Sequence, residues 1–294
     1  MSQYRRFEAT VAGGELVGGE WNPLAPGTPV FAVHGITASH LAWRAVADRL
    51  EGTRVIAPDL RGRGRSNALP APWGIRDHAD DAVRVLDALE VDSAVVIGHS
   101  MGGFVAVRLA AAHPDRVAHV VLVDGGLPLP STPGTPDTGD ALALLGPAAD
   151  RLTKLFPTRE AYADFWRAHP AFSDWNDDIA AYVDYDLEPA GDGFRSSSRV
   201  EAVATNIVQL GAGDGYLEAL AALPGTIDFL HAPRGLLNEI PPLYPADRMA
   251  EHTTTFPALR IHEIDDVNHY TILMSEHGAA QVVRVLREFE GVNS

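Results

Sequence analysis

AVVIGHSMGGFVAV, residues Ala94–Val107, is the stretch that decides the fold. Its first residues are apolar and mostly β-branched, as in a strand buried on both faces, and its last residues suit a helix. Between them stands Ser100, with a glycine two positions before it and another two positions after it. This G-x-S-x-G pattern alone is close to a chance match. The strand before it and the helix after it supply the strand–turn–helix setting of a nucleophilic serine.

The expected turn gives the serine its chemistry. A tight strand-to-helix turn strains the serine backbone and leaves no room for a Cβ atom at the flanking positions, Gly98 and Gly102. The hydroxyl is then exposed above the sheet, and the backbone N–H of Met101 lies at the helix N-terminus, where the helix dipole supports donation to an oxyanion. We therefore expect Ser100 to attack a carbonyl carbon and Met101 to help bind its oxygen.

Outward from this stretch, short apolar runs alternate with longer amphipathic ones. Apolar runs that do not alternate in polarity indicate buried strands, and their alternation with helices indicates right-handed crossovers. We thus predict an α/β fold with a mostly parallel central sheet and helices on both faces. Strands are expected at 29–35, 54–59, 94–98, 117–126, 226–235 and 258–265, and helices at 41–51, 77–90, 102–114 and 277–290.

The alternation stops at a run rich in Pro, Thr and Gly and resumes about a hundred residues later. Residues 1–126 and 225–294 are therefore predicted to form the α/β core. Residues 127–224 are predicted to form a helical cap, inserted between two core strands.

Aromatic residues are concentrated in this insertion, with eight between positions 156 and 185. Such a cluster can fill the core of a small helical subdomain, line an apolar substrate pocket, or do both. From it we expect Trp166, Trp175 and Tyr185 to contact the substrate.

Composition excludes several functional classes. The formal charge of −16 argues against nucleic acid and anionic membranes as partners, since both select for clustered positive charge. The absence of cysteine excludes thiolate metal sites and a cysteine nucleophile, and no H-E-x-x-H pattern is present, so neither a metal nor a cofactor is expected. The first residues have no apolar signal region, and no apolar run reaches the roughly 18 residues of a membrane span. A cytoplasmic protein is therefore expected, and its oligomeric state is left open.

Three motifs each follow an expected strand: VHGITAS at 33–39, DLRGRGRS at 59–66 and GHSMGG at 98–103. In this order and setting they resemble the oxyanion loop, a structural turn and the nucleophile elbow of the α/β-hydrolase family. The resemblance covers nearly the whole chain. It implies that the Ile36 amide is a second oxyanion donor beside Met101, and that the basic RGRGR sequence is a structural turn.

An imidazole must take the serine proton, because a serine hydroxyl at its ordinary pKa is a poor nucleophile. The family order of nucleophile, acid and base places the base in the loop after the last strand, where His269 lies. His262 is expected within that strand and His277 at the start of the final helix. His34 and His99 flank the oxyanion elements, and we expect them to orient the backbone or to line the substrate pocket.

The acid is less clearly marked. The family most often places it after the strand that follows the cap, in a Gly-x-x-Asp sequence, but the corresponding residue here is Asn238. An amide carries no charge to stabilise an imidazolium. Asp124, which ends the strand after the nucleophile helix, resembles a family variant found in some haloalkane dehalogenases and in zearalenone lactonases. We predict Asp124 as the acid, with Glu239 or another arrangement as the alternative.

These residues predict a serine-dependent hydrolase that cleaves a carboxylic ester or a lactone through an acyl-enzyme. Its partner would be a small molecule with an apolar or aromatic group. Hydrolysis of carbon–carbon bonds or amides, and perhydrolysis without a cofactor, use the same residues on this fold and stay open. A ligand receptor without catalytic activity is the alternative from another class.

Overall fold

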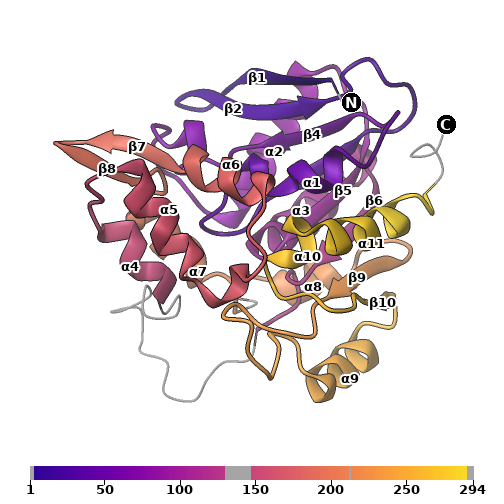
Figure 1. The fold of residues 1–294 in the computed structure, drawn as a ribbon. Helices are drawn as coiled ribbons and strands as arrows, with labels where there is room; N and C mark the ends of the chain where they lie inside the picture. Colours follow the sequence, from indigo (N-terminus) through magenta and orange to yellow (C-terminus); the bar gives the residue numbers. More distant parts are fainter. Residues whose placement is uncertain (1–2, 130–146, 212, 290–294) are drawn as a thin grey trace.

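The computed structural model describes residues 3–129, 147–211 and 213–289, with an eight-stranded sheet at its centre (Figure 1). The strands are β1 (Tyr4–Val11), β2 (Gly14–Trp21), β3 (Val30–Val33), β4 (Val55–Pro58), β5 (Ala94–His99), β6 (Val117–Val123), β9 (Ile227–His231) and β10 (Leu259–Glu263). Their order in space is β1-β2-β4-β3-β5-β6-β9-β10. β2 pairs antiparallel with β1 and β4, and the other pairs are parallel. The predicted α/β fold with a mostly parallel sheet is confirmed.

The hairpin of β1 and β2 is an addition to the strands expected from the sequence. β1 buries Phe7, Ala9 and Val11 on one face and exposes the residues between them. Glycine and glutamate make up most of β2, and both are poor strand formers. β2 is a strand because it has hydrogen-bonded neighbours on both sides, which its own sequence does not reveal.

Helices cover both faces of the sheet. On one face lie α2 (Ile75–Ala88), α3 (Met101–Ala112) and α9 (Ala246–Thr255), and on the other lie α1 (Arg44–Ala47), α10 (Thr271–Met274) and α11 (Glu276–Leu286). Phe31 and Val33 of β3 pack into the first layer, and Val30 and Ala32 into the second. Burial on both faces explains why these strands are uniformly apolar. None of the helices in the described ranges has the length and apolar character needed to cross a membrane.

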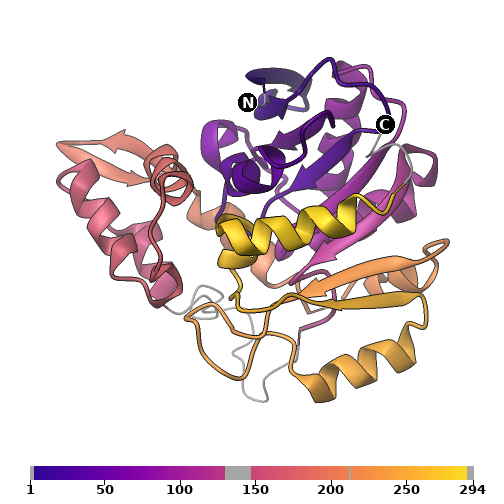
Figure 2. The ribbon, with the colours of Figure 1, turned by 45° about the vertical axis from the view of Figure 1, so that its right-hand side comes forward.

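Between β6 and β9 the chain forms helices and a small hairpin that lie beside the sheet (Figures 1 and 2). They are α4 (Pro147–Thr153), α5 (Arg159–Arg167), α6 (Asp177–Tyr185), β7 (Leu187–Ala190), β8 (Gly193–Ser196), α7 (Val200–Ile207) and α8 (Tyr216–Ala221). We call α4 to α7, with β7 and β8, the cap. α8 falls in the expected insertion but packs against the core helix α3. Residues 130–146 of the expected insertion lie outside the described residues.

The aromatic side chains of the cap pack against one another. Tyr162, Trp166 and Phe172 are almost fully buried. The ring centroids of Trp166 and Phe172 are 5.4 Å apart and those of Phe156 and Tyr162 are 4.8 Å apart, both pairs meeting edge to face. This is the favoured geometry of aromatic pairs. The cluster therefore fills the core of the cap, which is one of its two expected roles.

The DLRGRGRS motif forms a turn after β4. Asp59 accepts hydrogen bonds from the backbone N–H groups of His40 and Arg65, each at 2.8 Å. Arg61 is buried and binds Asp81 through two hydrogen bonds of 2.6 and 2.7 Å. A guanidinium buried in this way adds no charge to the surface, so its role here is structural.

Candidate active site

Ser100 stands in a strained turn between β5 and α3. Its backbone has φ 55° and ψ −122°, which residues with a side chain rarely adopt. A Cβ atom on Gly98 would lie 2.2 Å from the carbonyl oxygen of Gly102, and one on Gly102 would lie 2.1 Å from that of Val33. Both positions therefore require glycine, as expected for this turn.

Asp124 and His269 meet at the carboxyl end of the sheet. Asp124 Oδ2 accepts a hydrogen bond from His269 Nδ1 at 2.7 Å, and Asp124 Oδ1 accepts one from the backbone N–H of Ala232 at 3.1 Å. Both side chains are buried. Because a carboxylate only accepts hydrogen bonds, the imidazole proton lies on Nδ1, and the unprotonated Nε2 can accept a proton.

The rival candidate acid, Glu239, and the amide Asn238 at the family's usual acid position both bind elsewhere. Asn238 Oδ1 accepts a hydrogen bond from Arg234 Nε at 2.7 Å. Glu239 Oε2 accepts one from the backbone N–H of Leu237 at 2.6 Å, within its own exposed loop. Of the two candidate acids, Asp124 alone bonds to the imidazole of His269 in the part of the chain that the structure describes.

Backbone contacts place Ser100 beside this pair. Its N–H donates to the carbonyl oxygen of Val123 at 3.0 Å, so Ser100 and Asp124 stand at the ends of neighbouring strands. A Cβ on Gly125 would lie 2.2 Å from the Ser100 carbonyl oxygen, so the two segments touch. Among the described residues no hydrogen bond joins the Ser100 hydroxyl to His269. Catalytic hydrogen bonds of this kind often tighten only when a substrate binds.

His99 holds the backbone of the loop that carries His269, the candidate base. Its Nε2–H donates to the carbonyl oxygen of His269 at 2.8 Å, and the two ring centroids are 4.6 Å apart. Burial lowers the pKa of His99 well below its usual value, so the ring is neutral. Its Nδ1 therefore carries a lone pair, with no partner among the described residues. Orienting the backbone is one of the two roles expected for His99.

Two backbone N–H groups near Ser100 are available to a ligand. Met101 is the first residue of α3, so its N–H has no acceptor within the helix. Gly35 lies against the serine, since a Cβ on Gly35 would be 3.1 Å from Ser100 Cβ. The next residue, Ile36, has an N–H without a backbone acceptor in the described ranges. These are the two amides expected to bind an oxyanion.

His34 orients the oxyanion loop (residues 33–39). Its Nδ1–H donates to the carbonyl oxygen of Gly35 at 2.7 Å, and its Nε2 accepts from the backbone N–H of Leu60 at 3.0 Å. Burial lowers the pKa of His34 to about 4, so the ring is neutral. Since both nitrogens bind the protein itself, neither is left for a substrate.

Arg63 reaches the same loop from the turn after β4. Its Nε donates to the carbonyl oxygen of Ile36 at 2.9 Å, and its Nη2 donates to Asn206 Oδ1 in α7 at 2.7 Å. Burial lowers the pKa of Arg63 to about 9. The sequence places Arg63 in a structural turn but carries no sign of this contact.

The aromatic residues expected to bind substrate lie in different surroundings. Trp166 lies near the candidate base, since its ring centroid is 6.1 Å from that of Tyr270, the residue after His269. Tyr185 donates its hydroxyl to Asp59 at 2.6 Å, and Trp175 stacks on an arginine of α5. Substrate contact stays a prediction for all three.

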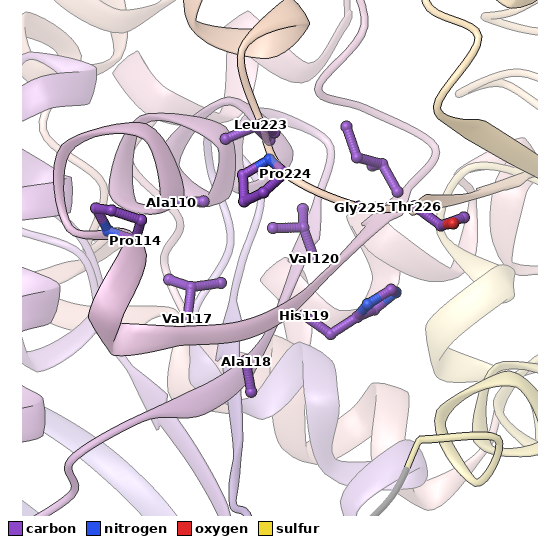
Figure 3. Close-up of a pocket in the computed structure, with 11 residues that line it drawn as sticks. Ala110, Pro114, Val117, Ala118, His119, Val120, Leu223, Pro224, Gly225 and Thr226 are labelled. Carbon is purple, nitrogen blue, oxygen red and sulfur yellow. The ribbon is translucent and has the colours of Figure 1, made fainter.

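A cavity of about 140 Å³ is lined by residues at the start of β6 and just before β9 (Figure 3). Its lining includes Pro114, which precedes β6, His119, which lies within β6, and Pro224, which precedes β9. Because β5, β6 and β9 are parallel, their amino ends are remote from Ser100 at the carboxyl end of β5. This cavity is therefore separate from the candidate active site.

Sequence comparisons match part of the chain. The profile of the family described as alpha/beta hydrolase fold matches residues 28–159. Lipase LipV of Mycobacterium tuberculosis (strain ATCC 25618 / H37Rv) is 40% identical over 109 residues, which are 37% of this chain and 41% of the lipase. The 2-hydroxymuconate semialdehyde hydrolase of Pseudomonas sp. (strain CF600) is 41% identical over 114 residues, 37% of this chain and 40% of that enzyme. The chain thus spans about two fifths of the length of these relatives.

Structural comparison extends over nearly the full length. The thioesterase domain from the curacin biosynthetic pathway superposes with a TM-score of 0.75, covering 97% of this chain and 99% of that domain. The sequences are 21% identical, so the likeness concerns the fold.

Proposed function

We propose that this chain, which belongs to the α/β-hydrolase fold superfamily, is a serine-dependent hydrolase that cleaves a carboxylic ester or a lactone. The observation that carries the proposal is the buried hydrogen bond between Asp124 and His269, next to the strained turn at Ser100. A nucleophile, a base and an acid in this relation are the parts of a serine hydrolase triad.

In the proposed reaction, the Ser100 hydroxyl attacks the carbonyl carbon while His269 Nε2 takes its proton. The Asp124 carboxylate holds the Nδ1 proton and stabilises the imidazolium that forms. The carbonyl oxygen becomes an oxyanion that accepts hydrogen bonds from the N–H groups of Ile36 and Met101. The imidazolium then protonates the leaving alkoxide. A water molecule, deprotonated by the same imidazole, releases the acid and restores Ser100.

The substrate class is inferred from the relatives and from the cap. The matched segment is shared with a lipase, and the fold with a thioesterase domain, which favours acyl transfer to water. The aromatic cap near Tyr270 favours an apolar or aromatic group. The likeness to 2-hydroxymuconate semialdehyde hydrolase favours a second candidate function, in which the same triad cleaves a carbon–carbon bond.

A fluorophosphonate probe tests the proposal without knowledge of the substrate. The wild-type protein should be labelled on Ser100, and the Ser100→Ala variant should not be labelled. Absence of labelling in the wild type, or equal labelling of the variant, would contradict the nucleophile. Turnover of aryl esters, alkyl esters, lactones and a vinylogous diketone then separates ester hydrolysis from cleavage of a carbon–carbon bond.

A further inference from the structure

Three consecutive carbonyl groups of the oxyanion loop each accept a hydrogen bond from a buried side chain. The first two donors, His34 and Arg63, were described above. The third is Arg151, whose Nη2 donates to the carbonyl oxygen of Thr37 at 2.8 Å. All three donors are almost fully buried, so water does not compete for these bonds.

The three bonds fix the direction of the Ile36 N–H. In a trans peptide, the C=O and N–H groups point in opposite directions, so the carbonyl of Gly35 determines where the Ile36 N–H points. The bonds from Arg63 to the Ile36 carbonyl and from Arg151 to the Thr37 carbonyl fix the next two peptide planes, so the whole loop cannot turn away from this orientation. Such alignment matters because an oxyanion donor contributes about 100- to 1,000-fold to kcat.

Arg151 differs from the other two donors because it belongs to the cap. Its Nη1 donates to Asp186 Oδ2 at 2.5 Å, and to Tyr162 Oη and Ser196 Oγ, each at 3.0 Å. One guanidinium therefore joins a buried carboxylate of the cap to a carbonyl of the oxyanion loop. The planar fork of arginine makes both contacts at once, which a lysine ammonium cannot do.

We propose that Arg151 is a positioning residue through which the cap aligns the oxyanion loop. The proposal rests on the proposed hydrolase function and deepens it, because the cap would then align the oxyanion loop in addition to covering the site. If Arg151 only held the cap together, its loss would lower stability and leave the turnover of each folded molecule unchanged.

Arg151→Lys tests the proposal, since lysine keeps the charge opposite Asp186 and gives up the bond to Thr37. Activity is measured on p-nitrophenyl butyrate and divided by the number of active sites titrated with a fluorophosphonate, so unfolded protein does not count. We expect kcat per site to fall by about 10- to 100-fold with KM within about 3-fold of wild type. The rate constant of phosphonylation should fall by the same factor as kcat/KM, because its transition state also places negative charge on an oxygen.

Two control variants separate alignment from stability. Tyr162→Phe removes a cap partner of Arg151 but keeps the bond to Thr37, so it should lower Tm with kcat per site within about 3-fold of wild type. Arg159→Gln removes an exposed cap arginine, paired with Asp184, and should change neither quantity. If Arg151→Lys fails to fold, the double variant Arg151→Met with Asp186→Asn, which removes both charges, takes its place.

The proposal is overturned if the Arg151 variant keeps kcat and phosphonylation rate per site within about 3-fold of wild type, since loss of alignment must appear in both. It is also overturned if Tyr162→Phe shows an equal fall in kcat. Failure of the wild type to react with the fluorophosphonate is a different result, which refutes the hydrolase function itself.

Discussion

Replacing Asp124 by asparagine should abolish most activity while leaving the fold intact. Asparagine has the same shape, and it tolerates the backbone conformation found here, in which φ is 44°. Asp124 Oδ1 accepts from the backbone N–H of Ala232, so the asparagine oxygen will take that place and its NH2 group will face His269. An NH2 group donates, which moves the imidazole proton from Nδ1 to Nε2.

This change of tautomer determines how far kcat should fall. With a proton on Nε2, His269 cannot accept the Ser100 proton. The buried site also no longer holds a carboxylate that would stabilise an imidazolium. The equivalent change in a serine protease lowers kcat about 10,000-fold, which is about 5 kcal/mol of transition-state stabilisation. We expect a loss of that order in Asp124→Asn.

The assay is hydrolysis of p-nitrophenyl butyrate, with Tm as the check on folding. Glu239→Gln is the matched control, because it makes the same chemical change at the rival carboxylate, and it should retain kcat within about 2-fold. The reasoning is refuted if Asp124→Asn keeps more than about a tenth of the wild-type kcat, or if Glu239→Gln loses as much as the aspartate variant.

Three further predictions concern the surroundings of the triad. Gly125→Ala should inactivate the protein, because the new Cβ would lie 2.2 Å from the carbonyl oxygen of Ser100. The control Gly211→Ala, whose new Cβ would have no atom within 4 Å, should retain kcat in the same ester assay. His99→Leu should lower kcat about 10-fold, because the loop that carries His269 loses a hydrogen bond. His99→Gln, whose amide can replace the Nε2 donor, should recover most of this kcat. Equal kcat values for the two variants would contradict a role for the hydrogen bond. Because burial lowers the pKa of His34 to about 4, the unfolded chain binds more protons than the folded one between that value and about 6.5. Stability should therefore fall on acidification, by about 2 kcal/mol from this group between about pH 7.5 and pH 5, and urea unfolding of His34→Asn should show a pH dependence shallower by that amount.

The sequence was informative where function depends on neighbouring residues. The turn at Ser100 could be predicted because its cause, two glycines around a serine between a strand and a helix, lies within a few residues. The loop of His269 could be placed because it follows the last strand. The helix expected at 41–51 is instead a 3₁₀ turn followed by the short α1. Tertiary contacts, more than propensity, decide where such an amphipathic segment ends.

The sequence was less informative where function depends on distant segments. It offered Asp124 and Glu239 as candidate acids, because the partner of His269 is set by how β6 lies relative to the loop after β10. The contacts of Arg63 and Arg151 with the oxyanion loop had no sequence signal. Arg151 lies 114 residues from its acceptor, and the packing of the cap on the core brings them together.

The order of the candidate groups along the chain has a consequence for synthesis. Ile36, Ser100, Met101 and Asp124 all precede the cap, and His269 follows Asp124 by 145 residues. At the usual ribosomal rate of about 5–20 residues per second, this interval lasts roughly 7–30 s. During that time a growing chain would hold the candidate serine and carboxylate but would lack His269, the candidate base. If the proposed function is correct, the nascent protein would therefore be inactive, and hydrolysis would begin only once the last part of the sheet and its final helices had been added.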